Sequence, residues 1–130
     1  MSKLKECTPY HFNAPLAILI CYDSSVSWKR HYDKKDMGDV DSSIVTTQMM
    51  LEIANLGLGT TWVGHFSLEL IKEKFNLPEY FVPVALLPIG YPSEDSVPNK
   101  LHNIRHDIQE TVFFNSFEGI KPGKNKTTDH

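Results

Sequence analysis

The sequence predicts one small domain that mixes helices and strands, and three observations support this fold class. The chain has 130 residues, 41% of them hydrophobic, which is enough to bury a single core. Two apolar runs, 14–22 and 82–90, have the composition of buried strands, and apolar residues recur at helical spacing in 41–56. We expect the domain to cover residues 1–117 and a Lys-, Gly- and Thr-rich tail at 118–130 to be disordered.

The composition argues against several classes of protein. The 13 basic and 16 acidic side chains give a net charge of −3, so the chain lacks the basic excess of a nucleic-acid-binding protein. The longest apolar run, 16–21, is far shorter than the roughly 20 residues of a membrane span. The polar lead-in 1–13 holds no apolar signal core, and two cysteines make no disulfide framework, so we expect a cytoplasmic protein.

The first expected element is a strand at 14–22, which its consecutive apolar residues predict to be buried on both faces. Pro15 stands at its start, where a missing N–H does least harm. The charged stretch 26–40 that follows is predicted to be irregular, with Trp28 and Tyr32 as its large apolar groups. We interpret it as a surface loop with both rings docked on the core; the alternative is a loop that forms one wall of a ligand site.

The segment 41–56 has the clearest helical pattern. Asp41 or Ser42 can cap its first turn, and Gly57 can supply the left-handed residue that ends it. Its apolar stripe is wide, so we expect a central helix whose stripe faces the core. The stripe consists of Ile44, Val45, Met49, Ile53, Leu56 and, in part, Leu51.

The glycine-rich segment 57–66 has the composition of a short strand whose backbone lies close to another group. It matches no phosphate-binding fingerprint, because it follows a helix and lacks the required glycine spacing.

A short helix is expected at 67–75, with Ser67 as its N-cap. The strand expected at 82–90 contains two prolines, which require a bulge, an edge position or the strand ends. The stripe of the short helix is Leu68, Ile71 and Phe75.

Residue types alone give no strong catalytic constellation. Cys7 has no basic neighbour beyond Lys5 to activate it, so we interpret it as a structural thiol. His102 and His106 have a spacing that would share one helix face, but two ligands do not make a metal site. His65 is either a solvated or partly buried histidine or a group at the mouth of a cofactor site. The apolar segment 107–117 is expected to be an arm docked on a surface, such as that of another subunit.

An ordered series of motifs across residues 8–117 resembles the nitroreductase family. One such motif is moderately specific, whereas the ordered series is strongly so. The series consists of 12–15 (FNAP), 41–51 (DSSIVTTQMML), 56–64 (LGLGTTWVG), 77–78 (LP), 83–92 (PVALLPIGYP), Pro98, Leu101-His102 and Arg105.

The resemblance implies an FMN-dependent oxidoreductase that accepts a hydride from NAD(P)H at the flavin N5 and reduces nitroaromatic or quinone-like acceptors. It implies an α+β fold, with an antiparallel sheet flanked by helices and an extended C-terminal arm. It also implies a homodimer with FMN at the interface. Because the flavin carries the redox chemistry, no catalytic triad is required.

The resemblance also assigns residues to the cofactor site. Four residues would pass beside the isoalloxazine ring, with the N–H groups of Gly64 and His65 facing the flavin N5 and O4. Arg105 matches the family's phosphate-binding arginine, and Lys100 is a weaker candidate; without the resemblance, Arg105 would be a solvated surface arginine. The four residues beside the ring are Trp62, Val63, Gly64 and His65.

The chain departs from the family pattern at its N-terminal end. The family's Arg- and Ser-rich segment, which holds the FMN phosphate, has no counterpart, since residues 1–7 contain no arginine. The chain is therefore expected to match the C-terminal half to two thirds of a nitroreductase. It would act as a homodimer or with a complementing N-terminal chain; the alternative is a non-catalytic module that binds a partner chain without flavin.

Overall fold

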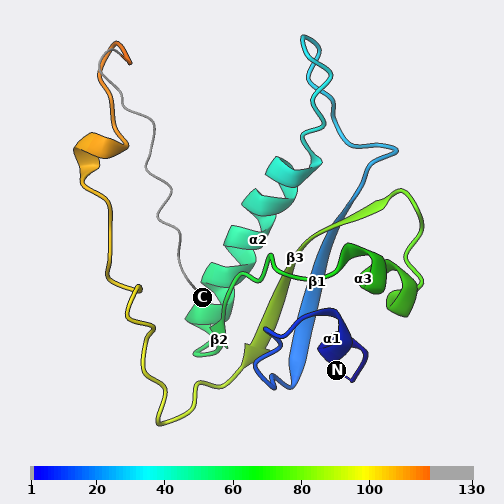
Figure 1. The fold of residues 1–130 in the computed structure, drawn as a ribbon, viewed down its shortest axis with the longest axis vertical. Coiled ribbons are helices and arrows are strands. Elements are labelled where there is room, and N and C mark those ends of the chain that lie inside the picture. The colour runs from blue at the N-terminus through cyan, green and yellow to red at the C-terminus, as the bar shows by residue number, and fades with distance from the viewer. Residues whose placement is uncertain (1, 118–130) are drawn as a thin grey trace. The chain divides into compact units, whose positions relative to one another are not determined.

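The computed structural model describes residues 2–117, and the chain divides into two compact units, Met1–Glu94 and Asp95–His130. The first unit contains the strands and α-helices of the described residues (Figure 1). The disorder predicted for 118–130 lies outside the described residues. Among the helices within 2–117, none has the length and apolar character needed to cross a membrane.

An antiparallel sheet of three strands, in the order β1-β3-β2, forms the centre of the first unit. β1 (Leu16–Asp23) pairs along its length with β3 (Phe81–Gly90), and β2 (Gly59–Thr60) pairs with the end of β3. The α+β fold class is confirmed. β1 packs on both faces, as predicted, since Leu19 belongs to the packing on one face and Ile18 and Ile20 to that on the other; most of its residues are half-buried.

A register shift accommodates the first proline of β3, although β3 is the central strand. Ile20 pairs with Ala85, whereas the next residue, Cys21, pairs with Pro83. Val84 is therefore skipped in the pairing with β1. This irregularity is the bulge that a proline inside a strand requires.

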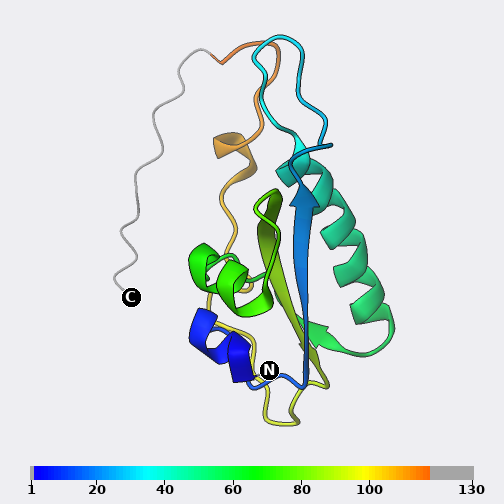
Figure 2. The same cartoon turned by 90° about the vertical axis from the view of Figure 1, so that its right-hand side faces the viewer.

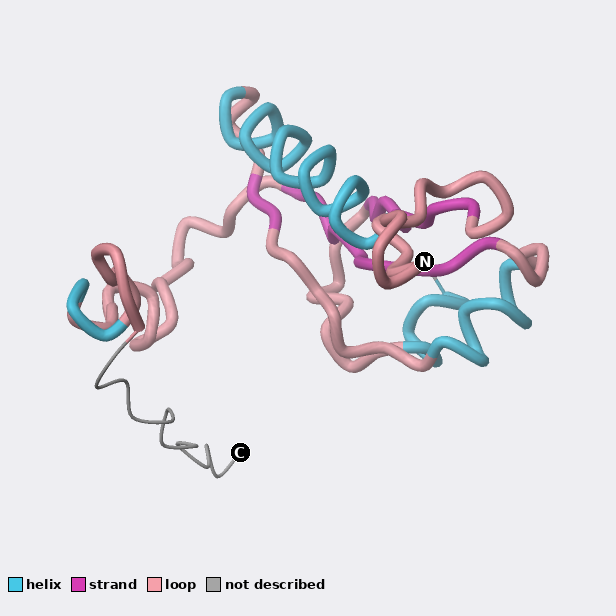
Figure 3. Tube along the Cα trace, turned by 90° about the horizontal axis from the view of Figure 1, so that it is seen from above, coloured by secondary structure: helices cyan, strands magenta, loops and turns pink. Residues whose placement is uncertain are grey.

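Helices cover both faces of the sheet (Figure 2; Figure 3). α2 (Gly38–Asn55) lies along one face, and α1 (Ser2–Cys7) and α3 (Leu68–Phe75) lie along the other. Leu86 and Leu87 are neighbours on β3 and belong to different core clusters, because successive side chains of a strand point to opposite faces. The α1/α3 cluster contains Leu4, Cys7, Val63, Ile71 and Leu86, and the α2 cluster contains Ile20, Ile53, Leu87 and Ile89.

α2 begins earlier than predicted, and most of its predicted stripe points away from the core. Its N-cap is Met37, which makes no side-chain capping bond, so Asp41 and Ser42 do not cap the helix. Gly57 follows the helix with φ at 73°, which confirms the left-handed end. The helix packs on the α2 cluster through Ile53, Met49 and Met50, and Thr46 is fully buried. The stripe residues that are exposed are Ile44, Val45, Leu51 and Leu56.

Of the two short helices, the sequence predicts α3 but not α1. α3 agrees with the prediction: the Ser67 hydroxyl accepts a hydrogen bond from the Leu70 N–H at 3.3 Å. Of its predicted stripe, Ile71 is fully buried, whereas Leu68 and Phe75 are exposed. α1 lies inside the segment predicted to be a polar lead-in, and it buries Leu4 and Cys7.

The loop between β1 and α2 forms a hairpin that extends beyond the N-terminal end of α2 (Figure 1). Trp28 is 60% exposed and Tyr32 is 94% exposed, so the prediction that both rings dock on the core is wrong. Polar bonds hold the loop instead. The Asp36 carboxylate accepts a hydrogen bond from the Ser27 hydroxyl at 2.7 Å and pairs with Lys29 at 3.4 Å.

The second unit, taken by itself, holds the predicted apolar arm and one short 3-10 helix, η1 (Ile108–Glu110). The Phe113 and Phe117 rings lie 5.6 Å apart between centroids. The apolar residues of the arm are nevertheless exposed within the described structure. Docking of the arm on another surface therefore stays a prediction. The exposed residues are Ile108, Val112, Phe113, Phe114 and Phe117.

Candidate functional site

The residues that connect β2 to α3 run beside the central strand. Val63 is buried, its N–H donates to the Leu86 carbonyl, and its carbonyl accepts from the Leu86 N–H, both at 2.9 Å. This isolated bridge and the two residues of β2 stand where a short strand was predicted at 57–66. The bridge fixes Val63 on the sheet, and the chain leaves the sheet immediately afterwards.

Gly64 and His65 carry two neighbouring backbone N–H groups that have no acceptor among the residues the structure describes. Both residues are exposed. A Cβ added at Gly64 would meet only the Trp62 indole nitrogen, at 3.7 Å, so the chain leaves open space at this position. Two adjacent unpaired donors beside open space suit a planar ligand with acceptor atoms along one edge.

Aromatic side chains gather beside these two donors. The His65 imidazole meets the Tyr10 ring edge-on, with 5.6 Å between centroids, and Tyr10 lies 6.3 Å from Phe12. Trp62 is 37% exposed. His65 is thus a solvent-exposed group at the candidate site, in contact with the lead-in residues. Tyr10 belongs to no periodic pattern in the sequence, and Phe12 belongs only to the FNAP motif.

A buried threonine ties the same segment to the N-terminal residues. The Thr8 hydroxyl donates to the His65 carbonyl at 2.7 Å and accepts from the Tyr10 N–H at 3.1 Å. The Ser67 N–H donates to the Cys7 carbonyl at 2.9 Å. Sequence reasoning missed Thr8, because a threonine before a proline resembles any turn residue.

Arg105 and Lys100 lie in the second unit. The Arg105 guanidinium donates to the carbonyls of His102 and Ile104, at 2.8 and 2.9 Å, so its side chain folds back on its own turn. Trp62 to His65 are contiguous in the first unit. The assignment of Arg105 to a phosphate stays a prediction.

The remaining titratable groups do not form a metal centre. His106 Nδ1 lies 2.9 Å from a carboxylate oxygen of Glu110. Throughout residues 2–117, no group of three or more His, Cys, Asp or Glu side chains could hold a metal ion. Burial raises the pKa of the Cys7 thiol and also that of Cys21. Both thiols are therefore held in the neutral form, which agrees with a structural role for Cys7.

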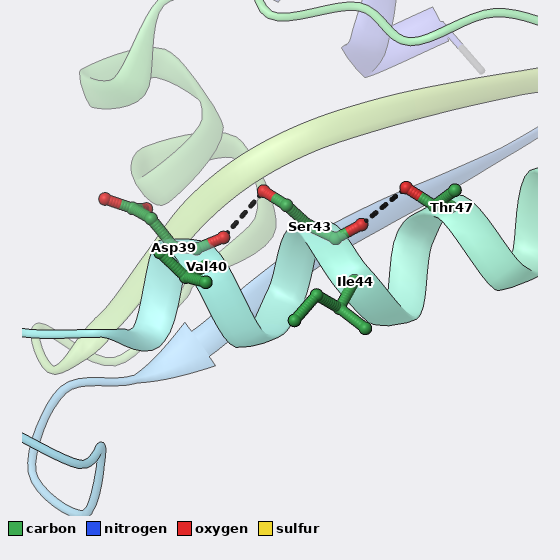
Figure 4. A pocket seen from close by; sticks show the side chains of 5 residues that line it. All are labelled: Asp39, Val40, Ser43, Ile44 and Thr47. Carbon is green, nitrogen blue, oxygen red and sulfur yellow. Dashed lines mark hydrogen bonds between the residues drawn. The ribbon is translucent and has the colours of Figure 1, made fainter. Parts of the chain in front are cut away.

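A shallow hollow of about 340 Å³ lies along the outer side of α2, away from the candidate donors. Figure 4 shows the hydroxyls of Ser43 and Thr47 bonded to carbonyls of the helix itself. The hollow is lined by one helix and has no converging polar groups, so it is part of an exposed helix face. Its lining residues are Asp39, Val40, Ser43, Ile44 and Thr47.

Comparison with known proteins identifies the same family as the motif series. The model of the Nitroreductase family matches residues 6–91. A crystal structure of a nitroreductase family protein from Clostridium difficile is 37% identical, with a TM-score of 0.80, and the alignment covers 88% of this chain and 67% of that one. An FMN-dependent nitroreductase from the same species is 26% identical, with a TM-score of 0.60, over 81% of this chain and 60% of that one.

A curated protein of Methanothermobacter thermautotrophicus, whose name pairs NADH dehydrogenase with NAD(P)H nitroreductase, is 33% identical over 107 residues. The match covers 73% of this chain and 51% of that protein. The chain thus spans about half the length of the curated relatives it matches.

Proposed function

The chain belongs to the nitroreductase family, and from this premise we propose that it binds FMN and acts as an NAD(P)H-dependent flavin oxidoreductase. The observation that supports the proposal most directly is the pair of unpartnered N–H groups at Gly64 and His65, beside open space. Bound FMN would supply the redox chemistry, with NAD(P)H as the hydride source and a nitroaromatic or quinone-like compound as the acceptor.

In this proposal the backbone of 62–65 holds the edge of the isoalloxazine ring. Val63 is bonded to Leu86 of β3, so the two N–H groups that follow it begin from a fixed position beside the sheet. Donors held in place favour a ligand on which negative charge develops, because they need no reorganisation. The partly exposed Trp62 ring adds apolar surface next to them.

Arg105 is the proposed ligand of the FMN phosphate. A guanidinium presents a fixed fork of donors that fits phosphate oxygens. In the structure these donors are bonded to two backbone carbonyls of the second unit, and those bonds would be exchanged for phosphate. Lys100, which is exposed in the same unit, is the weaker candidate.

We also propose that the chain works as a homodimer, with a complementing N-terminal chain as the other possible partner. The outer side of α2 supports a protein contact, because large apolar side chains are exposed along the helix. Such side chains in a row are typical of interaction surfaces. Those along α2 are Ile44, Val45 and Leu51, and the C-cap residue Leu56 is exposed as well.

The first test is the visible absorption spectrum of the purified full chain, before and after FMN is added and the excess removed. We expect flavin bands near one equivalent per chain, together with NAD(P)H oxidation in the presence of a nitroaromatic or quinone. A folded chain that retains no FMN would contradict the proposal and support the alternative of a partner-binding module without flavin.

Gly64→Ala tests whether FMN uses the open space at that position. The added methyl meets nothing closer than 3.7 Å in the protein, so the thermal midpoint should stay unchanged. We expect the FMN dissociation constant to rise by about tenfold or more, because overpacking against a ligand costs about 1–3 kcal/mol.

Gly59→Ala is the matched control, since its Cβ would meet a Pro92 side-chain carbon at 3.4 Å, outside the candidate site. It should bind FMN like the wild type. Equal affinity for FMN in all three proteins would contradict the placement of the flavin.

A further inference from the structure

The hydroxyl of Thr8 is a buried side-chain contact between the N-terminal residues and the proposed flavin-facing backbone. Thr8 is 2% exposed, and its hydroxyl donates to the carbonyl of His65, which lies 57 positions further along the chain, at 2.7 Å. The same oxygen accepts the Tyr10 N–H at 3.1 Å. Because the hydroxyl is engaged as both donor and acceptor, its orientation is fixed.

Two anchors therefore enclose the pair of unpartnered donors. On one side, Val63 is bonded to Leu86 through both its N–H and its carbonyl. On the other side, the Thr8 hydroxyl holds the carbonyl of His65. Gly64 lies between the anchors and has no side chain to restrict its backbone. Without the second anchor, the peptide groups on either side of His65 could rotate.

Backbone donors bind a ligand more tightly when they are already oriented toward it, since they then need no reorganisation on binding. A buried hydrogen bond from a neighbouring segment is a common way to hold such a group. The adjacent bond from Ser67 N–H to the Cys7 carbonyl docks the N-terminal helix independently of Thr8. Loss of the Thr8 hydroxyl would therefore loosen the His65 N–H and leave α1 attached.

We propose that Thr8 is a positioning residue that orients the N–H group of His65 toward the flavin, whereas the bond between the Val63 carbonyl and Leu86 holds the peptide that carries the Gly64 N–H. This inference rests on the proposed function, because it assumes that these N–H groups face FMN. Thr8 itself touches no ligand in this scheme and acts through the His65 carbonyl.

The test compares Thr8→Val with Thr8→Ser in the full chain. Valine keeps the shape of the side chain and removes the hydroxyl, whereas serine keeps the hydroxyl. We expect Thr8→Val to raise the FMN dissociation constant about tenfold and to lower the flavin midpoint potential, and Thr8→Ser to restore both. In flavin-free protein, the ¹⁵N relaxation of His65 should show greater mobility in Thr8→Val alone, whereas that of Gly64, whose peptide Leu86 holds, should stay unchanged.

Thr46→Val is the matched control. Thr46 is as deeply buried, and its hydroxyl donates to the Ser42 carbonyl at 2.6 Å within α2. The Thr46→Val variant should leave the FMN dissociation constant within about twofold of wild type and the flavin midpoint potential unchanged. Equal FMN binding by wild type and Thr8→Val, or equal losses in the Thr8→Val and Thr46→Val proteins, would overturn the inference. A wild-type chain that binds no FMN would overturn the proposed function instead, and the flavin-free relaxation would still show whether Thr8 holds the His65 N–H.

Discussion

The two faces of the sheet are covered in different ways. On one face, α3 buries Ile71 completely and turns charged side chains to solvent. On the other face, α2 packs Ile53 on the sheet, buries Thr46, and leaves Ile44 and Leu51 exposed. Both helices expose apolar side chains, but α3 does so at its two ends, Leu68 and Phe75, whereas α2 does so along most of a much longer helix. The longer exposed face of α2 is the surface that a partner chain would cover in the proposed dimer.

The largest expected effect tests whether both faces contribute equally to stability. Leu86 is 2% exposed on the α1/α3 face, and Leu87 is fully buried on the α2 face. Leu86→Ala and Leu87→Ala should each lower the free energy of unfolding by about 2–5 kcal/mol, because each leaves a cavity. Urea denaturation measures both values. A loss below about 1 kcal/mol for either variant would show that its face is loosely packed.

A smaller effect is expected at the start of α3. The Ser67 hydroxyl caps the helix, so Ser67→Ala should cost about 1 kcal/mol of unfolding free energy. Ser43 on α2 is the matched control, because its hydroxyl donates to the Asp39 carbonyl inside the helix and caps nothing. Ser43→Ala should be neutral or slightly stabilising, since alanine has the higher helix propensity. Equal losses would contradict a capping role for Ser67.

The smallest effect on stability is expected on the outer side of α2. Substitutions there also test most directly how α2 differs from α3. Ile44→Lys and Leu51→Lys should each change the free energy of unfolding of the isolated chain by less than about 0.5 kcal/mol, because both side chains are exposed. Both should weaken self-association in sedimentation experiments. Leu68→Lys on α3, where the side chain is 51% exposed, is the control and should leave association unchanged. A monomeric wild type at all concentrations would contradict the proposed dimer.

Much of the fold follows from local chemistry in the sequence. The α3 cap at Ser67, the left-handed stop at Gly57 and the bulge at Pro83 each depend on one residue type in one backbone geometry. Such features are decided within a few residues. They were therefore predictable without knowledge of the tertiary structure.

The orientation of α2 and the existence of α1 were not predictable in this way. A helix with apolar residues on every side has no unique buried face. Whether the side that carries Thr46 or the side that carries Ile44 is buried therefore depends on what packs against the helix. α1 has only six residues, and its burial of Leu4 depends on contact with α3 and on Leu86 of the sheet. Short helices are marginal without such contacts.

The candidate site was predictable only through the family resemblance. Trp62 to His65 carry no recognisable phosphate or catalytic motif, because the groups proposed to bind FMN are backbone N–H groups that almost any residue possesses. The partner that bonds to His65, Thr8, is distant in sequence and comes from a segment without periodicity. Contacts of this kind arise from the tertiary fold alone.

The two prolines of β3 also affect how the chain behaves before it folds. The stretch Phe81–Gly90 is strongly apolar and would otherwise suit intermolecular cross-β stacking. Pro83 and Pro88 lack the N–H groups that such a ladder requires, so they act as gatekeepers during synthesis and refolding. The run 16–21 in β1 has no such interruption and forms an edge of the described sheet. Aggregation of the unfolded chain is therefore expected to begin at β1 and not at β3.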